Sequence, residues 1–302
     1  MLKSSTITVA CVLCVGAAPE LYLTAALRAI ADAVDVLVVN DNSGVPFSEN
    51  RAVLAASTFA ARNALCLEAH PFVDFADMRN RAFAQLGALA SPPDWVLFLD
   101  ADEVHGEQMR YIAREILPRI PPAVGEVDAY TYHFFGTYRW ITDVARRSVF
   151  FRYHPDIRWV NRLHEKVVGV RGRALVLPYT YHHYGNVVPP ALLARKHQQY
   201  FALGNRVPRP PEPDTATPEI YLANAAAVRP YHSGHPQAAR PTLARLEAQF
   251  AHEFAALDTE FSARRGAATR AIGALHALNE GLRVQLRRLE RPLIYRLPTR
   301  AR

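Results

Sequence analysis

Short apolar runs alternate with stretches of helical spacing over the first hundred residues. The apolar runs, rich in β-branched residues, predict four strands, at residues 7–15, 34–39, 64–69 and 95–99. Apolar positions three and four residues apart predict helices between them, at residues 19–33, 51–62 and 77–90. Strands that alternate with helices predict an α/β fold with a largely parallel sheet covered on both faces. Ligands of such sheets bind beyond the carboxyl ends of the strands, so the residues that follow strands are the first candidates for a site.

The pattern changes after residue 127, where strands are expected with few helices between them. These strands are predicted at residues 127–135, 148–152 and 174–181. Helices are predicted at residues 190–204, 220–228 and 241–257, with a proline-rich stretch at 206–218. Leucines three and four residues apart between Leu275 and Leu293 predict an amphipathic helix with arginines opposite. We therefore expect three units: an α/β domain at 1–205, a proline-rich linker with helices at 206–262, and a basic C-terminal helix at 263–302.

Charge is distributed unevenly along the 302 residues. The chain has 35 Lys and Arg against 28 Asp and Glu, a net charge of +7. Residues 263–302 hold ten Arg and two Glu, so the rest of the chain is almost neutral. Because the body lacks a basic face, we expect no nucleic-acid partner. The tail has two interpretations: its leucines pack on the body or on a second copy, or the helix lies on an anionic membrane.

The three cysteines do not form a metal or disulfide pattern. Cys11 and Cys14 lie in the first apolar run, and Cys66 has no second pair beside it, so buried free thiols are expected. The N-terminus lacks a secretory signal pattern, and no uninterrupted apolar run is long enough to span a membrane. We expect a cytoplasmic protein, held at the inner face of the membrane if the tail is an interfacial helix.

The strongest chemical signal is an Asp-x-Asp motif directly after the strand at 95–99. Asp100, Asp102 and Glu103 follow this strand, and two carboxylates one residue apart can reach one hard cation such as Mg²⁺ or Mn²⁺. Asp41 ends an earlier strand, where it can accept a hydrogen bond from a base or ribose. The alternatives are that Asp100 caps a following helix and that Asp41 is a turn residue.

Further candidates lie in two other parts of the chain. Arg79 and Asn80 open a predicted helix, where a guanidinium can pair with phosphate, although Arg79 can also be an exposed helix residue paired to Asp77. Later in the chain, imidazoles can complete a metal shell or have a structural role, and a nearby carboxylate can act as a general base. These later candidates are His164, Glu165, His182 and His183.

Taken in order, the motifs resemble a known family. They read DFADMRNRA at 74–82, DWVLFLDADE at 94–103, RLHE at 162–165 and HYG at 183–185. This order resembles the bacterial family 2 glycosyltransferases with a GT-A fold, over roughly residues 5–200. The resemblance implies a mixed, mostly parallel sheet flanked by helices, with the C-terminal helices as an extension.

The same resemblance implies an activity and roles for the candidates. It implies transfer of a sugar, with inversion, from a nucleoside-diphosphate sugar to an acceptor hydroxyl. The favoured donor is a UDP-sugar, and the acceptor is a glycan, a lipid-linked molecule or a protein, with a role in cell-surface glycan synthesis. The implied metal is Mn²⁺ or Mg²⁺. The expected metal ligands are Asp100, Asp102, His183 and His164; the donor-binding residues are Asp41, Arg79, Asn80 and Asp100; the catalytic base is Glu165, with Glu103 as the alternative.

Two loops depart from the family pattern and motivate other hypotheses. Residues 14–20 lack the usual Asn-Glu pair, and residues 41–46 lack the usual second acid of the Asp-x-x-Ser-x-Asp loop. The second hypothesis is therefore a non-catalytic module that binds a sugar nucleotide or a glycan. The third is a metal-dependent phosphohydrolase with Asp-x-Asp as nucleophile and acid, although such enzymes carry the motif on the first strand.

Overall fold

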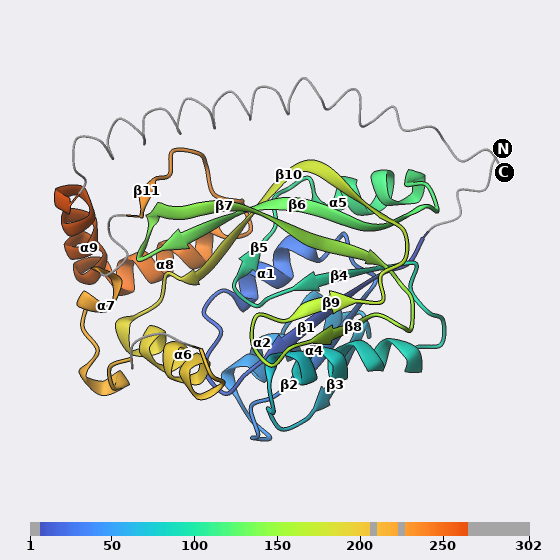
Figure 1. Cartoon of the computed structure of the whole chain (residues 1–302), viewed down its shortest axis with the longest axis horizontal. Helices are drawn as coiled ribbons and strands as arrows, with labels where there is room; N and C mark the ends of the chain where they lie inside the picture. Colours follow the sequence, from blue (N-terminus) through green and yellow to red (C-terminus); the bar gives the residue numbers. More distant parts are fainter. Residues whose placement is uncertain (1–6, 206–209, 223–226, 265–302) are drawn as a thin grey trace.

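A nine-stranded mixed sheet forms the centre of the molecule. The computed structural model describes residues 7–205, 210–222 and 227–264. The strand order is β3-β2-β1-β4-β7-β6-β10-β5, with β11 beside β7, and β8 and β9 form a separate hairpin (Figure 1). The strands are β1 (Val9–Val15), β2 (Val36–Asp41), β3 (Leu65–Ala69), β4 (Trp95–Leu99), β5 (Glu103–Val104), β6 (Val124–Phe135), β7 (Thr137–Arg152), β8 (Arg158–Val160), β9 (Lys166–Val168), β10 (Arg173–Asn186) and β11 (Arg229–Pro230).

The N-terminal half of the sheet is parallel and covered on both faces. β1 lies between β2 and β4 and runs parallel to both, and β3 runs parallel to β2. Alternate residues of β1 enter different clusters: Cys11 and Leu13 pack with Leu27 of α1, whereas Ala10 and Val12 pack with Phe83 of α4. The expected α/β class, with a central sheet flanked by helices, is confirmed. All four of these strands end at the same edge of the sheet.

The second half of the sheet is built on a long antiparallel hairpin. β6 pairs with β7, and β7 also pairs antiparallel with β4, which joins the two halves. Gly136 makes the turn with a φ of +72°, and a Cβ there would lie 2.7 Å from the ring of Phe261. The sequence predicted a strand only at 148–152, because polar and charged residues interrupt the apolar pattern before it. β10 then returns parallel to β6 and antiparallel to β5.

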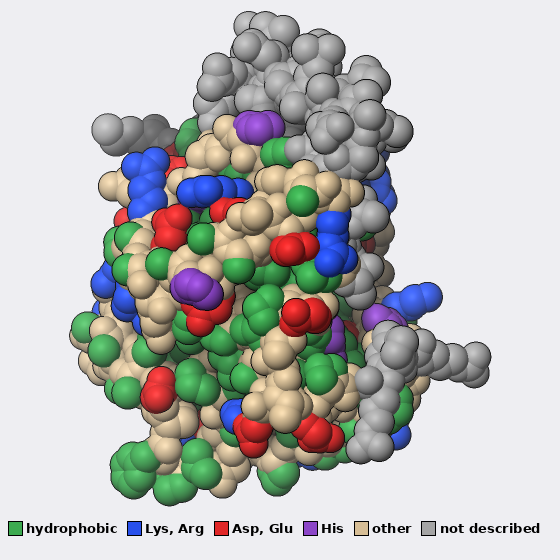
Figure 2. Space-filling model, turned by 90° about the vertical axis from the view of Figure 1, so that its left-hand side faces the viewer, with side chains coloured by type: hydrophobic (Ala, Val, Ile, Leu, Met, Phe, Trp, Pro, Cys, Tyr) green, Lys and Arg blue, Asp and Glu red, His purple; other side chains and the backbone are tan. Residues whose placement is uncertain are grey.

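Helices cover both faces and one end of the sheet. They are α1 (Leu23–Ile30), α2 (Glu49–Ala55), α3 (Thr58–Ala61), α4 (Phe75–Ala84), η1 (Gln85–Ala88), α5 (Met109–Tyr111), η2 (Ile112–Ile116), η3 (Leu117–Arg119), α6 (Pro190–Ala202), η4 (Pro213–Thr215), α7 (Glu219–Leu222), α8 (Arg240–Gln249) and α9 (Ala251–Arg264). α6, α7 and α9 gather at the left-hand end of Figure 1. Figure 2 turns this end toward the viewer and shows acidic side chains interspersed with apolar ones.

The helix expected at 241–257 is two helices that pack on the sheet. The chain bends at Phe250, where φ is −116°. The bend lets Leu246 of α8 join the cluster around Phe134 and lets Leu257 and Phe261 of α9 join a different cluster. No helix among the described residues is long and apolar enough to cross a membrane. The basic helix expected at 263–302 lies outside the described residues from residue 265 onward.

Candidate active site

The Asp-x-Asp motif forms a tight turn between β4 and β5. The backbone N–H of Asp100 donates to Oε2 of Glu103 at 3.1 Å, and the N–H of Glu103 donates to the carbonyl of Asp100 at 3.0 Å. Burial and the neighbouring charge of Asp100 raise the pKa of Glu103 to about 8. A strand rather than a helix follows, so Asp100 does not act as a helix cap.

Arg79 connects this turn to the distant Glu165. Its Nη2 lies 2.9 Å from Oδ1 of Asp100, and its Nε donates to Oε1 of Glu165 at 2.7 Å. Burial opposes the charge of the guanidinium, but the two carboxylates outweigh it and raise the pKa of Arg79. Asp77, the alternative partner of Arg79, is instead paired with Arg81 at 2.8 Å. The structure therefore brings together three candidates, of which Arg79 and Glu165 are 86 residues apart in the chain.

Asn80 holds the β8–β9 hairpin in place. Its Nδ2 donates to the carbonyl of Trp159 at 2.9 Å, and its Oδ1 accepts from the N–H of Trp159 at 2.7 Å. Both ends of the amide are thus engaged by one residue of β8. Asn80 differs here from the donor-contacting role expected of it, because its hydrogen bonds position the hairpin beside Glu165.

Asp102 faces a histidine and a lysine from two later elements. Its Oδ1 lies 3.3 Å from Nε2 of His183, and its Oδ2 lies 3.6 Å from Nζ of Lys196 on α6. Burial acts to raise the pKa of Asp102, but these two groups outweigh it and hold the pKa well below its usual range. Burial likewise opposes the imidazolium, yet Asp102 raises the pKa of His183. The two residues expected to bind metal are therefore neighbours.

Gly185 permits this approach. A Cβ at this position would lie 2.3 Å from Oδ2 of Asp102 and 2.7 Å from Nε2 of His183. The glycine of the HYG motif thus provides the space in which the carboxylate and the imidazole meet. Its carbonyl also accepts a hydrogen bond from Nζ of Lys196 at 3.2 Å.

A second histidine, His133, orients His183. The sheet register pairs His183 with His133 on β6 and with Glu103 on β5. The two Nδ1 atoms of the histidines are 3.0 Å apart. Burial, together with His183, lowers the pKa of His133 to about 4. A neutral His133 can therefore accept a hydrogen bond at its Nδ1 from Nδ1 of His183, which keeps Nε2 of His183 facing Asp102. His133 was not predicted as a site residue, because only the register of β6 and β10 makes it a neighbour of His183.

Glu20 was also missed as a site residue. It lies in the loop that follows β1, and the side chain of Asn50 holds this loop by donating to the carbonyls of Gly16 and Ala18 at 2.9 Å each and accepting from the N–H of Glu20 at 2.8 Å. Burial and the charge of Asp102 raise the pKa of Glu20 to about 7. Its position after a strand adjacent to β4 was the available signal.

Together these carboxylates form an acidic cluster, defined here as Glu20, Asp100, Asp102, Glu103 and Glu165. Among the described residues, the permanent cations that pair with it are Arg79 and Lys196. No group of three or more His, Cys, Asp or Glu side chains within the described ranges is arranged to hold a metal by itself. However, Oδ1 of Asp102 is buried without a hydrogen bond and faces Nε2 of His183. Because Mg²⁺ and Mn²⁺ are commonly held by one or two side chains plus substrate phosphates, this pair fits such an ion.

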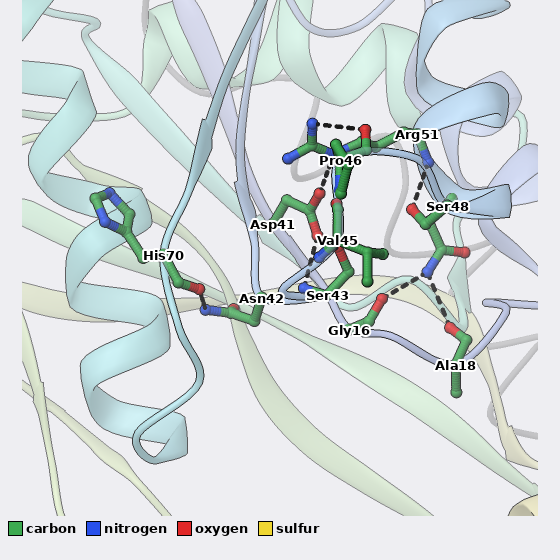
Figure 3. Close-up of polar contacts among 11 residues, drawn as sticks. Gly16, Ala18, Asp41, Asn42, Ser43, Val45, Pro46, Ser48, Arg51 and His70 are labelled. Atoms are coloured by element: carbon green, nitrogen blue, oxygen red, sulfur yellow. Dashed lines mark hydrogen bonds and ion pairs between the residues drawn. The ribbon is translucent and has the colours of Figure 1, made fainter.

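In the described structure, Asp41 and His164 make no hydrogen bond or ion pair with the acidic cluster. The Asp41 carboxylate is buried, pairs with Nε of Arg51 and accepts from the N–H of Ser43 at 2.8 Å (Figure 3). Burial acts to raise the pKa of Asp41, but Arg51 and Ser43 outweigh it and lower the pKa. Asp41 is thus the last residue of β2, and its carboxylate holds the turn that follows the strand. His164 is exposed, with a φ of +53°, and has no hydrogen bond or ion pair with Asp102 or His183 in the described structure.

Comparisons with known proteins give partial matches to solved structures. No family model and no curated protein matches the chain. A mycobacterial protein matches at 21% identity over 42% of this chain and 41% of its own, with a TM-score of 0.29. S. aureus TarS in complex with UDP matches at 16% identity over 44% and 37%, with a TM-score of 0.31. M. tuberculosis glucosyl-3-phosphoglycerate synthase in complex with Mn²⁺, UDP and glucosyl-3-phosphoglycerate matches at 17% identity over 41% and 44%, with a TM-score of 0.29. The chain spans less than half the length of each.

Proposed function

We propose that the protein is a metal-dependent glycosyltransferase of GT-A type that moves a sugar from a nucleoside-diphosphate sugar to an acceptor hydroxyl with inversion. The observation that carries this proposal is the convergence of Asp100, Asp102, Arg79, Glu165 and His183 at the carboxyl edge of the sheet. These residues come from four separate motifs, and each motif belongs to the family pattern. A UDP-sugar is the favoured donor, and a glycan, lipid-linked or protein molecule is the acceptor, in cell-surface glycan synthesis.

The donor diphosphate is proposed to bind at Asp102 and His183 together with Mn²⁺ or Mg²⁺. The bound ion supplies Lewis-acid stabilisation of the negative charge that develops on the leaving diphosphate. Asp102 and His183 would hold the ion, and the contact between His183 and His133 keeps Nε2 directed at the site. Asp100 would contact the donor ribose or, through water, the ion, while Arg79 holds Asp100 in position.

Glu165 is proposed as the general base. The acceptor oxygen forms a bond to the anomeric carbon while the bond from that carbon to the diphosphate oxygen breaks and its electron pair leaves with the diphosphate. The acceptor proton passes to Glu165, whose Oε1 is held by Arg79 and whose Oε2 remains for the acceptor. Glu103 is the weaker candidate because its carboxylate turns back to the N–H of Asp100.

The test is turnover of a nucleotide-sugar panel, measured as release of nucleoside diphosphate. Glu165→Gln should lower turnover by about 10²–10⁴-fold, because it removes the proton acceptor but keeps the shape. Glu247→Gln, an exposed change on α8, is the matched control and should retain full turnover. Release that needs no divalent ion, or near-full turnover of Glu165→Gln, would contradict the proposed chemistry.

One observation favours a non-catalytic binding module as the second candidate. The Asp41 carboxylate, which was expected to face the nucleoside, is paired with Arg51 instead. A binding module would retain nucleotide or glycan binding without turnover of any donor in the panel. Tight binding of a nucleoside diphosphate with no release of product would therefore favour this candidate.

A further inference from the structure

Lys196 is fixed at the edge of the acidic cluster by the packing of α6. One turn further along this helix, the ring of Tyr200 packs edge-on against Phe75 of α4, with centroids 5.4 Å apart and planes at 80°. The Lys196 ammonium donates to the carbonyl of Gly185 at 3.2 Å. These two contacts place the ammonium at the cluster, and 29% of its side chain remains exposed.

The ammonium has hydrogen-bonding capacity to spare. Its other neighbour, Oδ2 of Asp102, is 3.6 Å away, which is too far for a hydrogen bond. Among the described residues the ammonium thus uses one of its three donors. The groups that face it are Asp102, Tyr200, Asp100 and Glu20; burial acts to lower the pKa of Lys196, but these groups outweigh it and raise the pKa, so the charge is retained.

Arg79 is less free to bind an incoming anion. Its Nε is taken by Glu165 and its Nη2 by Asp100. The guanidinium therefore holds two carboxylates of the site in place. Of Arg79 and Lys196, it is Lys196 that faces Asp102 with unused donors in the described structure.

We propose that Lys196 is the protein's cation for the leaving diphosphate: its ammonium contacts the terminal phosphate of the nucleoside diphosphate, next to an ion held by Asp102 and His183. This inference rests on the proposed donor site and assigns to Lys196 the phosphate contact that the sequence suggested for Arg79. The terminal phosphate gains negative charge as the glycosidic bond breaks, and a cation already in position stabilises that charge without reorganisation. Lys196 is then a catalytic residue, whereas Arg79 is a positioning residue.

The experiment measures the preference for a diphosphate over a monophosphate. UDP, GDP, ADP, CDP and dTDP are titrated calorimetrically into the wild-type protein with Mn²⁺ and with EDTA, and the tightest binder is compared with its own monophosphate. The readout is the dissociation constant of the monophosphate divided by that of the diphosphate, measured in EDTA. This ratio should fall at least about tenfold in Lys196→Met and be largely kept in Lys196→Arg. Arg195→Met, a neighbouring exposed change on the same helix, should leave the ratio unchanged.

The outcomes separate this inference from the proposed function. If the wild-type protein binds no nucleoside diphosphate, the donor site itself is wrong and the inference fails with it. If the diphosphate binds and Lys196→Met keeps the wild-type ratio, Lys196 only neutralises Asp102 and the inference alone fails. Should Lys196→Met not fold, Lys196→Gln, which can still donate to Gly185, takes its place in the same comparison.

Discussion

Gly185 and Asp102 illustrate how single residues determine the geometry of the site. The absent side chain of Gly185 leaves space for Oδ2 of Asp102 and Nε2 of His183, which a Cβ would approach to 2.3 and 2.7 Å. Distances below 3.0 Å force one partner to move. Because Asp102 and His183 form an ion pair and are the two proposed metal ligands, a shift of either side chain would disturb the proposed metal site.

Gly185→Ala should therefore weaken binding of Mn²⁺ with a nucleoside diphosphate by about 10–100-fold, the effect usual for disturbing the residues that orient metal ligands. Gly234→Ala is the matched control, since nothing lies within 4 Å of a Cβ there. The measurement is calorimetric titration of both variants. Equal affinity of Gly185→Ala and wild type would show that the close approach of Gly185 has no role in ligand binding.

His105 determines part of the pH dependence of stability. It is buried, its Nδ1 lies 2.7 Å from Oη of Tyr179, and burial lowers its pKa to about 3. Below about pH 6.5 the unfolded chain takes up a proton at this residue while the folded protein does not, so stability present above pH 6.5 is lost as the pH falls toward 3.

When the pH is lowered from about 7.5 to about 5, the unfolding free energy of wild type should therefore fall by about 2 kcal/mol more than that of His105→Gln. Urea unfolding of both proteins at the two pH values measures this difference. The slope with pH is the readout, so a lower overall stability of the variant does not affect it. Parallel pH profiles would mean that His105 is not kept neutral by burial.

At the scale of elements, α4 supplies both a cation beside the acidic cluster and the support for the β8–β9 hairpin. Asp74 caps the helix by accepting from the N–H of Asp77 at 2.8 Å. The helix then directs Arg79 to the acidic cluster and Asn80 to the backbone of Trp159 on β8. The motif in 74–82 thus serves two tasks from adjacent residues.

Asn80→Ala should cost about 1–3 kcal/mol of unfolding free energy, because it leaves the buried N–H and carbonyl of Trp159 without partners. Gln199→Ala, an exposed change on α6, serves as the control. Turnover should also fall, since Glu165 follows β8 closely. Denaturant unfolding and turnover are measured on both variants. If Asn80→Ala is as stable and as active as the control, the hydrogen bonds of Asn80 to Trp159 do not support the β8–β9 hairpin.

The elements also show how far sequence patterns reach. The parallel strands, and the acids at the end of β4, were predicted because a continuous apolar run ending in acids is a local signal. β7 was predicted too short, because its first residues, from Thr137 onward, alternate with charges and depend on pairing with β6. The break at Phe250 was missed because the apolar spacing of α8 continues into α9 and only packing on two clusters separates them.

At the scale of the whole molecule, the site is assembled by pairing across the sheet. Asp100, Asp102 and Arg79 were identifiable from the sequence because their motifs follow or flank predicted elements. His133 and Lys196 were not, because the first depends on the register of β6 and β10 and the second on the docking of α6. Local periodicity contains neither kind of information. His164 directly precedes Glu165, but its side chain is exposed and pairs with no residue of the acidic cluster in the described structure.

The tail gives a prediction for the full chain. Nine of the ten arginines of 263–302 follow Arg264, and each basic residue near an anionic membrane contributes about 1 kcal/mol to binding. If the tail is an interfacial helix, the full chain should sediment with vesicles that contain anionic lipid, whereas a chain ending at Arg264 should not. High salt should reduce this binding. Equal partition of both proteins would remove the membrane contact from the proposal.

The most direct measurement is thermal unfolding of wild type and Asp102→Asn with a panel of nucleoside diphosphates, each with Mn²⁺ and with EDTA. Asp32→Asn, an exposed change on the surface, is the matched control. A ligand at a hundred times its Kd stabilises by about 2.7 kcal/mol, which gives a clear shift in Tm. We expect one nucleoside diphosphate to stabilise wild type and Asp32→Asn more with Mn²⁺ than with EDTA, and Asp102→Asn to lose this metal-dependent gain. No shift with any nucleotide, or the same gain in Asp102→Asn, would contradict a donor site at the acidic cluster.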